Sequence, residues 1–313
     1  MKRNLPRLFA LACAVVLGAC APTRFMASRM GPCRWNTETL QFEIGDAGAQ
    51  ARCLLRHVRQ GGVLGPAWPL PPTLGRLVGT PAIPTRDQLR SYVARRDLSP
   101  GQRHEWDVLM ADLDRPISHG WDNRADAPAA RYFVIHDTSE PYLATAPFPK
   151  TLDSDPDVND LGIYFRAPFN DPVAHVFTNR RGEIRIGHTF STPWRATKRE
   201  RFTDQRNKGM FIHIENGQPR RQNANGPRGE TTGPRPGFGE RQYDTLALLY
   251  MTASIQAGRW LIPGFHSAID EGIKDKHDDP QHFDLQRFDR SLARLVRAVE
   301  AVQGATPLPS ARK

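Results

Sequence analysis

A short apolar run that ends in a histidine constrains this chain most. Residues 132–135 are Tyr, Phe, Val and Ile, the composition of a buried strand, and His136 follows at the carboxyl end of the run. Downstream, residues 263–284 place His266 a short loop before Asp279. Imidazole and carboxylate groups are the side chains that zinc binds in hydrolytic sites. We therefore interpret His136, His266 and Asp279 as a set that holds one zinc ion.

The amino terminus has the pattern of an export signal. A basic start precedes an apolar run at residues 8–17, which is too short to span a bilayer. The Leu-Gly-Ala-Cys sequence at 17–20 resembles the bacterial lipobox, which implies removal of residues 1–19 and a lipid anchor on Cys20. Ala21 after this cysteine implies, by the same resemblance, sorting to the periplasmic face of the outer membrane. An ordinary secretory signal with a chance cysteine is the alternative.

The charge of the chain bears on its partners. The formal net charge is +10 at pH 7, and it falls to +7 without residues 1–19, which hold three basic and no acidic residues. A basic surface suits an acidic polymer such as peptidoglycan, teichoic acid or nucleic acid. The basic residues are scattered and no nucleic-acid-binding motif is present, so we expect no nucleic-acid partner.

Two of the four cysteines remain for the folded protein. Cys13 leaves with the signal and Cys20 carries the lipid, so Cys33 and Cys53 are left. In an oxidising periplasm these two are predicted to form a disulfide. Two unpaired thiols, or two metal ligands, are the alternative.

The chain divides into five parts by composition. Residues 1–19 are the predicted signal and 20–30 a tether. Residues 31–129 are rich in Pro and Arg and poor in long apolar runs, which predicts an irregular N-terminal extension packed on the main domain. Residues 130–303 form the predicted main domain, and 304–313 a tail.

Strands come before helices in the main domain. The segments 173–178 and 183–189 are predicted to pair as a hairpin, and 209–216 forms a further strand. Apolar residues recur at helical spacing in 241–257 and 285–302. This order predicts an α/β (α+β) fold, with a mixed central sheet flanked by helices. Nothing in the sequence demands more than a monomer.

A carboxylate ends the third of these strands. Met210, Ile212 and Ile214 alternate on one face, which places Glu215 on the opposite face at the strand's carboxyl end. The following residues, 216–239, form a long loop crowded with Gly, Pro, Asn and four arginines. Such a loop is usually functional or disordered. We expect its arginines either to line a groove for an anionic substrate or to lie on a loop exposed to solvent.

Together these motifs resemble a known enzyme family. In order they are the strand that delivers His136, Ala-His-Val at 174–176, Ile-x-Ile-Glu at 212–215, an amphipathic helix, His-Ser at 266–267 and Asp-Pro at 279–280. The chain is similar to the type-2 N-acetylmuramoyl-L-alanine amidases, which include bacteriophage-lysozyme-type amidases, bacterial murein amidases and animal peptidoglycan recognition proteins. The resemblance covers roughly residues 130–288, half of the chain.

The resemblance implies a zinc amidase fold and a role for each site residue. His136, His266 and Asp279 are the implied zinc ligands, and Glu215 is the implied catalytic acid/base. The family usually has a lysine two residues before the aspartate ligand, and His277 stands at that position here. His277, or Lys276 beside it, is thereby implied to stabilise the negative charge of the reaction intermediate.

One ligand position has two candidates. The loop that follows His266 is longer than the family's usual loop, so Asp278 remains an alternative to Asp279. Asp279 is preferred because the following Pro280 and Phe283 match the family pattern. Asp278 and Ser267 are then candidates for orienting the ligating imidazoles.

The implied reaction is hydrolysis of an amide. Two histidines and one aspartate leave the fourth zinc position to water, whose pKa falls to about 7 there. Glu215 then takes the proton and passes it to the leaving amine. In the family, the bond cut joins the lactyl group of N-acetylmuramic acid to the L-alanine of the stem peptide, in peptidoglycan or in muropeptides.

Two other functions stay open. A non-catalytic, peptidoglycan-binding lipoprotein would use such a fold for recognition alone, and it would be expected to lose a ligand or the glutamate. Another exported zinc hydrolase, a peptidase or a deacetylase, is the second. The helical His-Glu-x-x-His signature of metalloproteases is absent, as is the Gly-x-Ser-x-Gly elbow of nucleophilic hydrolases.

Overall fold

The computed structural model describes residues 33–144, 147–166, 172–273 and 277–302. The predicted signal, Cys20 and Lys276 lie outside these residues, as do the predicted tether and the whole of the predicted tail. No helix within the described ranges is long and apolar enough to cross a membrane.

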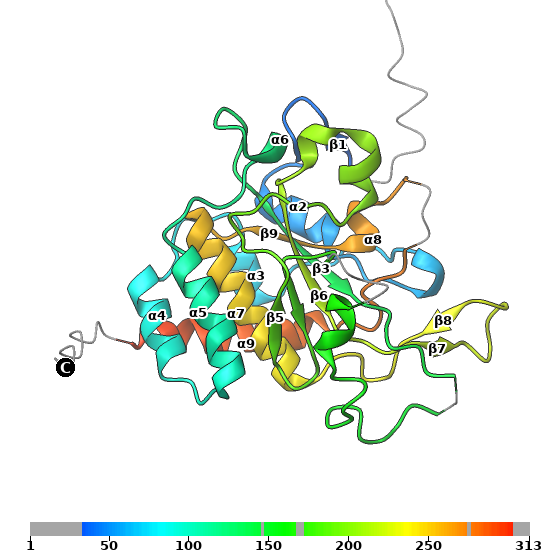
Figure 1. Cartoon of the computed structure of the whole chain (residues 1–313). Coiled ribbons are helices and arrows are strands. Elements are labelled where there is room, and N and C mark those ends of the chain that lie inside the picture. Colours follow the sequence, from blue (N-terminus) through cyan, green and yellow to red (C-terminus); the bar gives the residue numbers. More distant parts are fainter. Residues whose placement is uncertain (1–32, 145–146, 167–171, 274–276, 303–313) are drawn as a thin grey trace, which may run out of the picture.

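A five-stranded mixed sheet forms the centre of the molecule (Figure 1). Its strand order is β5-β4-β6-β3-β9. In that order the strands span Ile184–Ile186, Val176–Thr178, Phe211–Asn216, Tyr132–Asp137 and Ile262–Phe265. The last four are mutually parallel, and β5 is antiparallel to β4 at one edge. The predicted mixed sheet flanked by helices is therefore present.

The register of β3 and β6 puts the two predicted functional residues side by side. His136 of β3 pairs with Glu215 of β6. Side chains alternate along a strand, so Tyr132 and Val134 share the face of His136, while Phe133 faces the other way. All residues of both strands are buried, as expected for parallel strands covered on both faces.

Two long helices cover the face opposite the site. The ring of Tyr250 in α7 (Glu240–Ala257) lies 5.1 Å from the ring of Phe133. Helix α7 ends at Gly258, whose φ of 73° suits a residue without a Cβ. Helix α9 (Leu285–Glu300) packs beside α7 and buries one apolar face, made of Phe288, Leu292, Leu295, Val296 and Val299. Figure 1 shows both helices on the left of the sheet, with α8 on the right of β3.

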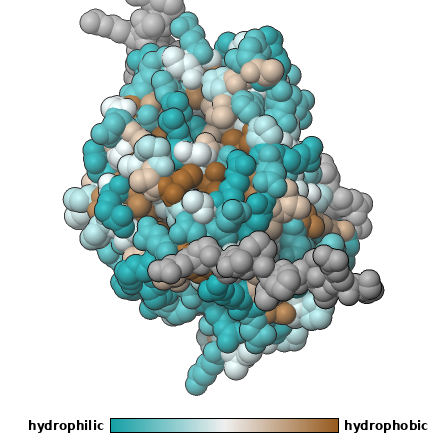
Figure 2. All heavy atoms as spheres, turned by 90° about the vertical axis from the view of Figure 1, so that its left-hand side faces the viewer, coloured by the Kyte–Doolittle hydropathy of each residue, from teal (hydrophilic) through white to brown (hydrophobic). Residues whose placement is uncertain are grey.

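The prediction of an irregular N-terminal extension is wrong, because residues 33–129 contain helices whose apolar side chains share the hydrophobic core of the main domain. The elements are β1 (Trp35–Asn36), β2 (Gln41–Phe42), α2 (Ala47–Leu54), η1 (Gln60–Gly62), α3 (Pro72–Leu77), α4 (Arg86–Ala94), α5 (Pro100–Asp112) and the short turn α6 (Gly120–Asn123). Trp106, Leu54 and Trp35 are among their fully or nearly fully buried side chains. Figure 2, which views the side that carries α4 and α5, shows a mainly hydrophilic surface with a few hydrophobic atoms near its centre.

Short elements fill the connections of the main domain. They are η2 (Leu161–Phe165), η3 (Arg199–Thr203), η4 (Gln205–Asn207) and a two-stranded hairpin of β7 (Arg221–Gln222) and β8 (Thr231–Thr232). The hairpin lies inside the long loop at 216–239. Arg220 of that loop is buried and paired with Asp137 at 2.7 Å, so it does not line an open groove.

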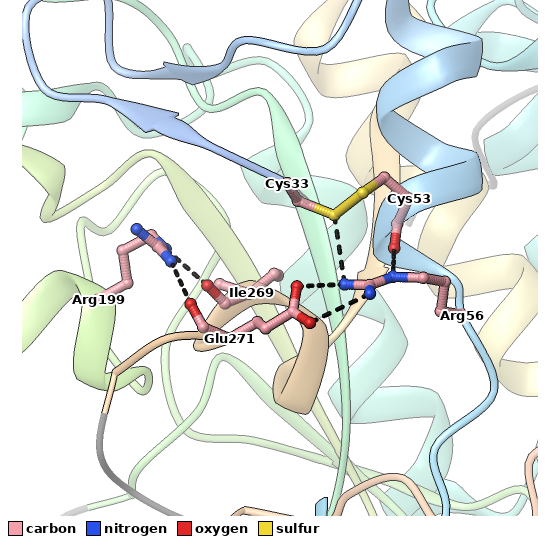
Figure 3. The surroundings of a disulfide bond; sticks show 6 residues. All are labelled: Cys33, Cys53, Arg56, Arg199, Ile269 and Glu271. Carbon is pink, nitrogen blue, oxygen red and sulfur yellow. Dashed lines mark hydrogen bonds and ion pairs between the residues drawn. A yellow bond between two sulfur atoms is a disulfide. The ribbon is translucent and has the colours of Figure 1, made fainter. Parts of the chain in front are cut away.

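The predicted disulfide is formed between Cys33 and Cys53 (Figure 3). Arg56 lies beside it, where Nε donates to the carbonyl of Cys53 at 2.7 Å. The same guanidinium pairs with Glu271, which follows the turn of α8 (His266–Ile269). The disulfide and this ion pair therefore connect the start of the described chain to the segment that carries His266.

Replacing Cys33 and Cys53 with serine is expected to lower the free energy of unfolding by about 3 kcal/mol. The two residues are 20 apart in sequence, and the bond removes the entropy of that loop from the unfolded chain. Denaturant unfolding of the double variant, compared with the oxidised protein, measures the difference. An unchanged unfolding midpoint would contradict the expectation.

Candidate metal centre

Three chain segments meet at the carboxyl edge of the sheet. Strand β3 delivers His136, and the neighbouring parallel strand β9 runs directly into α8, whose first residue is His266. The chain then returns with Asp279, whose backbone carbonyl accepts hydrogen bonds from Ser267 N at 3.1 Å and Ser267 Oγ at 2.7 Å. Ser267 thus holds the returning chain in place.

The three predicted ligands converge on one point. His136 Nδ1 lies 3.0 Å from His266 Nδ1, and His266 Nδ1 lies 3.0 Å from Asp279 Oδ2. The third side, from His136 Nδ1 to Asp279 Oδ2, is 3.6 Å. All three side chains are buried, and together they form a possible metal-binding cluster.

These distances fit a tetrahedral cation. Ligand atoms about 2.0 Å from a zinc ion in tetrahedral geometry are roughly 3.3 Å apart. Three lone-pair atoms this close repel one another unless a proton or a metal ion lies among them. Two neutral imidazoles and one carboxylate are also a donor set that zinc accepts. The residues present therefore fit the ion.

The ionisation of the cluster agrees with a shared cation. Burial alone would lower the pKa of His266, but Asp279 and Asp270 outweigh burial and raise this pKa well above its ordinary value. Burial alone would raise the pKa of Asp279, but the charge of His266 and hydrogen bonds from the neighbouring histidines hold it well below its usual range. Burial, followed by the charge of His266, lowers the pKa of His136 to about 3. A neutral His136 thus keeps a lone pair on one of its two ring nitrogens.

Glu215 borders the cluster without belonging to it. Its Oε1 lies 3.7 Å from His136 Nδ1, and the side chain is largely buried. Oε2 is buried and has no hydrogen-bond partner among the described residues. Burial, followed by the charge of Asp279, raises the pKa of Glu215 to about 8. The carboxyl group is therefore free to accept or donate a proton beside the ligand atoms.

His277 lies at the rim of the site. Its Nδ1 is 3.4 Å from Asp279 Oδ1, its ring lies beside that of His266, and its side chain is 43% exposed. Asp278 turns away from the cluster, toward Arg220 at 3.6 Å. Asp279, and not Asp278, thus contributes the carboxylate to the cluster.

Sequence reasoning missed the residues that contact the far side of each imidazole. His266 Nε2 lies 3.0 Å from Asp270 Oδ2, and His136 Nε2 lies 3.1 Å from His213 Nδ1. His213 Nε2 in turn lies 3.0 Å from Glu200 Oε2. The expected partners were Ser267 and Asp278. The side chain of Ser267 contacts backbone carbonyls instead, and that of Asp278 contacts Arg220 and Gln281. Asp270 carried a readable signal, because residues four apart on a helical turn are neighbours.

A cavity of about 890 Å³ lies elsewhere and does not contain these groups. It is lined by residues that include Lys150, Arg180, Arg235 and Arg241. A smaller cavity of about 120 Å³ borders the site itself and is lined in part by His277.

Comparison of the chain with protein-family models, with curated proteins and with solved structures found no match. The geometry and chemistry of the site therefore carry the functional argument.

Proposed function

We propose that the chain is a zinc-dependent N-acetylmuramoyl-L-alanine amidase that hydrolyses the amide between N-acetylmuramic acid and L-alanine in peptidoglycan or muropeptides. One observation carries the proposal. His136, His266 and Asp279 converge within 3.0–3.6 Å, and beside them lies a carboxyl oxygen of Glu215 that has no hydrogen-bond partner in the described part of the chain. This is a hydrolytic zinc donor set next to a proton acceptor, and it agrees with the order of motifs in the sequence.

Zinc bound by the three ligands would activate a water molecule and polarise the carbonyl of the scissile amide. Glu215 is the general base that removes the proton from the attacking water, and it then donates that proton to the departing amine of L-alanine. A pKa raised by burial suits both steps, because the group must accept and release a proton near neutral pH.

We assign to His277 the stabilisation of the charge that develops during the reaction. Its exposed position at the rim lets it meet a bound substrate, and in its protonated form it would stabilise the charge that develops on the amide oxygen. Lys276, the alternative candidate for this role, lies outside the described residues.

The proposed location follows from the amino terminus. A lipid on Cys20 would hold the protein at the periplasmic face of the outer membrane, and the disulfide is consistent with an oxidising compartment. Peptidoglycan is an acidic polymer within reach of such an anchor, and the net charge of +7 without residues 1–19 favours its approach.

Zinc affinity is expected to rise about tenfold for each pH unit while the Nδ1 atom of His266 is protonated. The pKa of His266 is raised well above 6.5, so the ion must displace one proton below that raised pKa, and the dependence disappears above it. Calorimetric titration with zinc, in buffers of different ionisation enthalpy around neutral pH, counts the protons released. A zinc affinity that stays constant across this range contradicts the expectation.

The function is tested with the chain from Ala21 onward, which contains every described residue. The zinc-loaded and chelator-treated proteins are incubated with purified muropeptides and with intact murein, and the products are analysed by mass spectrometry. Release of stem peptides that begin at L-alanine, only with zinc, supports the amidase. Binding to murein without cleavage indicates the peptidoglycan-binding lipoprotein, and cleavage at another bond indicates a different zinc hydrolase.

A further inference from the structure

One short segment contacts the groups behind both ligating imidazoles. Asp270, which lies behind His266, accepts hydrogen bonds from two consecutive backbone N–H groups. Lys198 N donates to Oδ2 at 2.7 Å and Arg199 N donates to Oδ1 at 2.9 Å. Each carboxylate oxygen of Asp270 is thereby fixed as an acceptor.

Glu200 likewise accepts hydrogen bonds from two consecutive backbone N–H groups, those of the two residues before Lys198. Ala196 N and Thr197 N donate to Glu200 Oε2 at 3.0 and 3.1 Å, and Thr197 Oγ1 adds a third hydrogen bond at 2.9 Å. Glu200 faces His213, which lies behind His136, and the side chains of both residues are fully buried. Four consecutive backbone N–H groups, from 196 to 199, thus serve the two carboxylates.

The side chain of Arg199 fixes the position of this segment against α8. Its Nε donates to the carbonyl of Ile269 at 2.6 Å, and Nη2 donates to the carbonyl of Glu271 at 3.3 Å (Figure 3). The segment is therefore attached to the same turn that carries Asp270.

With Nδ1 of each ligand given to the metal, these contacts assign the remaining imidazole protons. A neutral imidazole that binds a metal through Nδ1 carries its proton on Nε2. For His266 that proton points at Asp270. For His136 it points at His213 Nδ1, which must accept, so that His213 holds its own proton on Nε2 and donates it to Glu200. An acceptor at the end of each path satisfies this order: Asp270 for His266, and the ionised form of Glu200 for His213.

We propose that residues 196–200 are a positioning segment that, through Asp270 and through Glu200 with His213, holds both ligating histidines with Nδ1 free for zinc. The inference rests on the proposed zinc site. The segment contributes no ligand atom to the cluster, and it acts on the direction of the hydrogen bonds. Partners of this kind typically change metal affinity about 10–100-fold when they are altered.

The proton positions are tested directly in the unaltered protein. Long-range ¹H–¹⁵N spectra of the zinc-loaded chain from Ala21, labelled in histidine, report which ring nitrogen carries each proton. We expect Nε2–H for His136, His213 and His266. A proton on Nδ1 of His213, or of either ligand, overturns the inference.

Two isosteric variants test the effect on zinc. Glu200→Gln and Asp270→Asn each replace one accepting oxygen by a donating NH₂ group, and each is expected to weaken zinc binding about 10–100-fold in a chelator competition. Asp289→Asn is the matched control, because Asp289 is also buried and accepts the backbone N–H groups of Thr73 and Leu74, away from the site. Its zinc affinity is expected to equal that of the wild type.

The thermal unfolding of each metal-free variant separates positioning from folding. The inference holds if the two site variants lose zinc affinity while their melting temperatures fall no further than that of Asp289→Asn. Zinc affinity equal to wild type in both folded site variants overturns it and leaves the amidase proposal standing. A wild-type chain that binds no zinc overturns both.

Discussion

Glu215→Gln is expected to slow amide hydrolysis by about 10²–10⁴-fold while zinc remains bound. The amide is close in size to the carboxyl group but neither accepts the proton of the attacking water nor returns one to the leaving amine. Glu215 Oε1 lies 3.7 Å from His136 Nδ1, and Glu215 contributes no ligand atom to the cluster. We therefore expect the rate of hydrolysis to fall and the zinc content to stay unchanged. Product formation under saturating substrate, with zinc content measured on the same sample, checks both parts.

A second glutamate gives the control for this change. Glu240, at the start of α7, is exposed and pairs with Arg287 on the surface, so Glu240→Gln should leave rate and zinc content at wild-type values. If Glu215→Gln retains more than about a tenth of the wild-type rate, Glu215 is not the general acid/base.

His266→Ala is expected to cause a large loss of zinc affinity. Changing a residue that only contacts a metal ligand typically weakens binding about 10–100-fold, and we expect the loss here to be greater. The change removes one of three ligand atoms, and it also leaves Asp270 and Asp279 without their shared cation. Breaking a buried pair in this way costs about 3–5 kcal/mol of folding free energy. We therefore expect both a loss of zinc in equilibrium dialysis and a lower unfolding midpoint in denaturant.

The control for this variant is a histidine on the surface. His104 is exposed on α5, and His104→Ala should retain zinc and stability. Full zinc binding by a folded His266→Ala protein would show that the cluster is not the metal site.

Regular patterns made much of the sheet and its covering helices predictable. Alternation placed Ile212 and Ile214 on one face of β6 and Glu215 on the other, and helical spacing identified α7 and α9. Strand β9 was not predicted, because Pro263 and Gly264 resemble a turn. In the fold, a Cβ at Gly264 would meet the Cβ of Leu54 at 2.9 Å, so glycine there lets α2 approach the sheet closely. The formation of this strand depends on long-range packing, which the local sequence pattern does not reveal.

The sequence also predicted some residues of the candidate site and missed others. His136, His266 and Asp279 were recognisable because each stands at the end of an apolar run or beside a motif residue, and the fold brings all three together. His213 and Glu200 were not, because one is a buried histidine within a strand and the other lies in the short helical element η3, whose packing the local sequence pattern does not predict. Their relation to His136 exists only once β3, β6 and residues 196–200 are packed together.

The most direct test of the amidase proposal is hydrolysis of a muropeptide by the zinc-loaded chain in water enriched in ¹⁸O, with mass spectrometry of both products. We expect one heavy oxygen in the lactyl carboxylate of N-acetylmuramic acid and none in the released peptide, whose L-alanine amine is free. Heavy oxygen in a peptide carboxylate or in acetate would contradict the proposal, as would intact muropeptide after incubation with the zinc-bound protein.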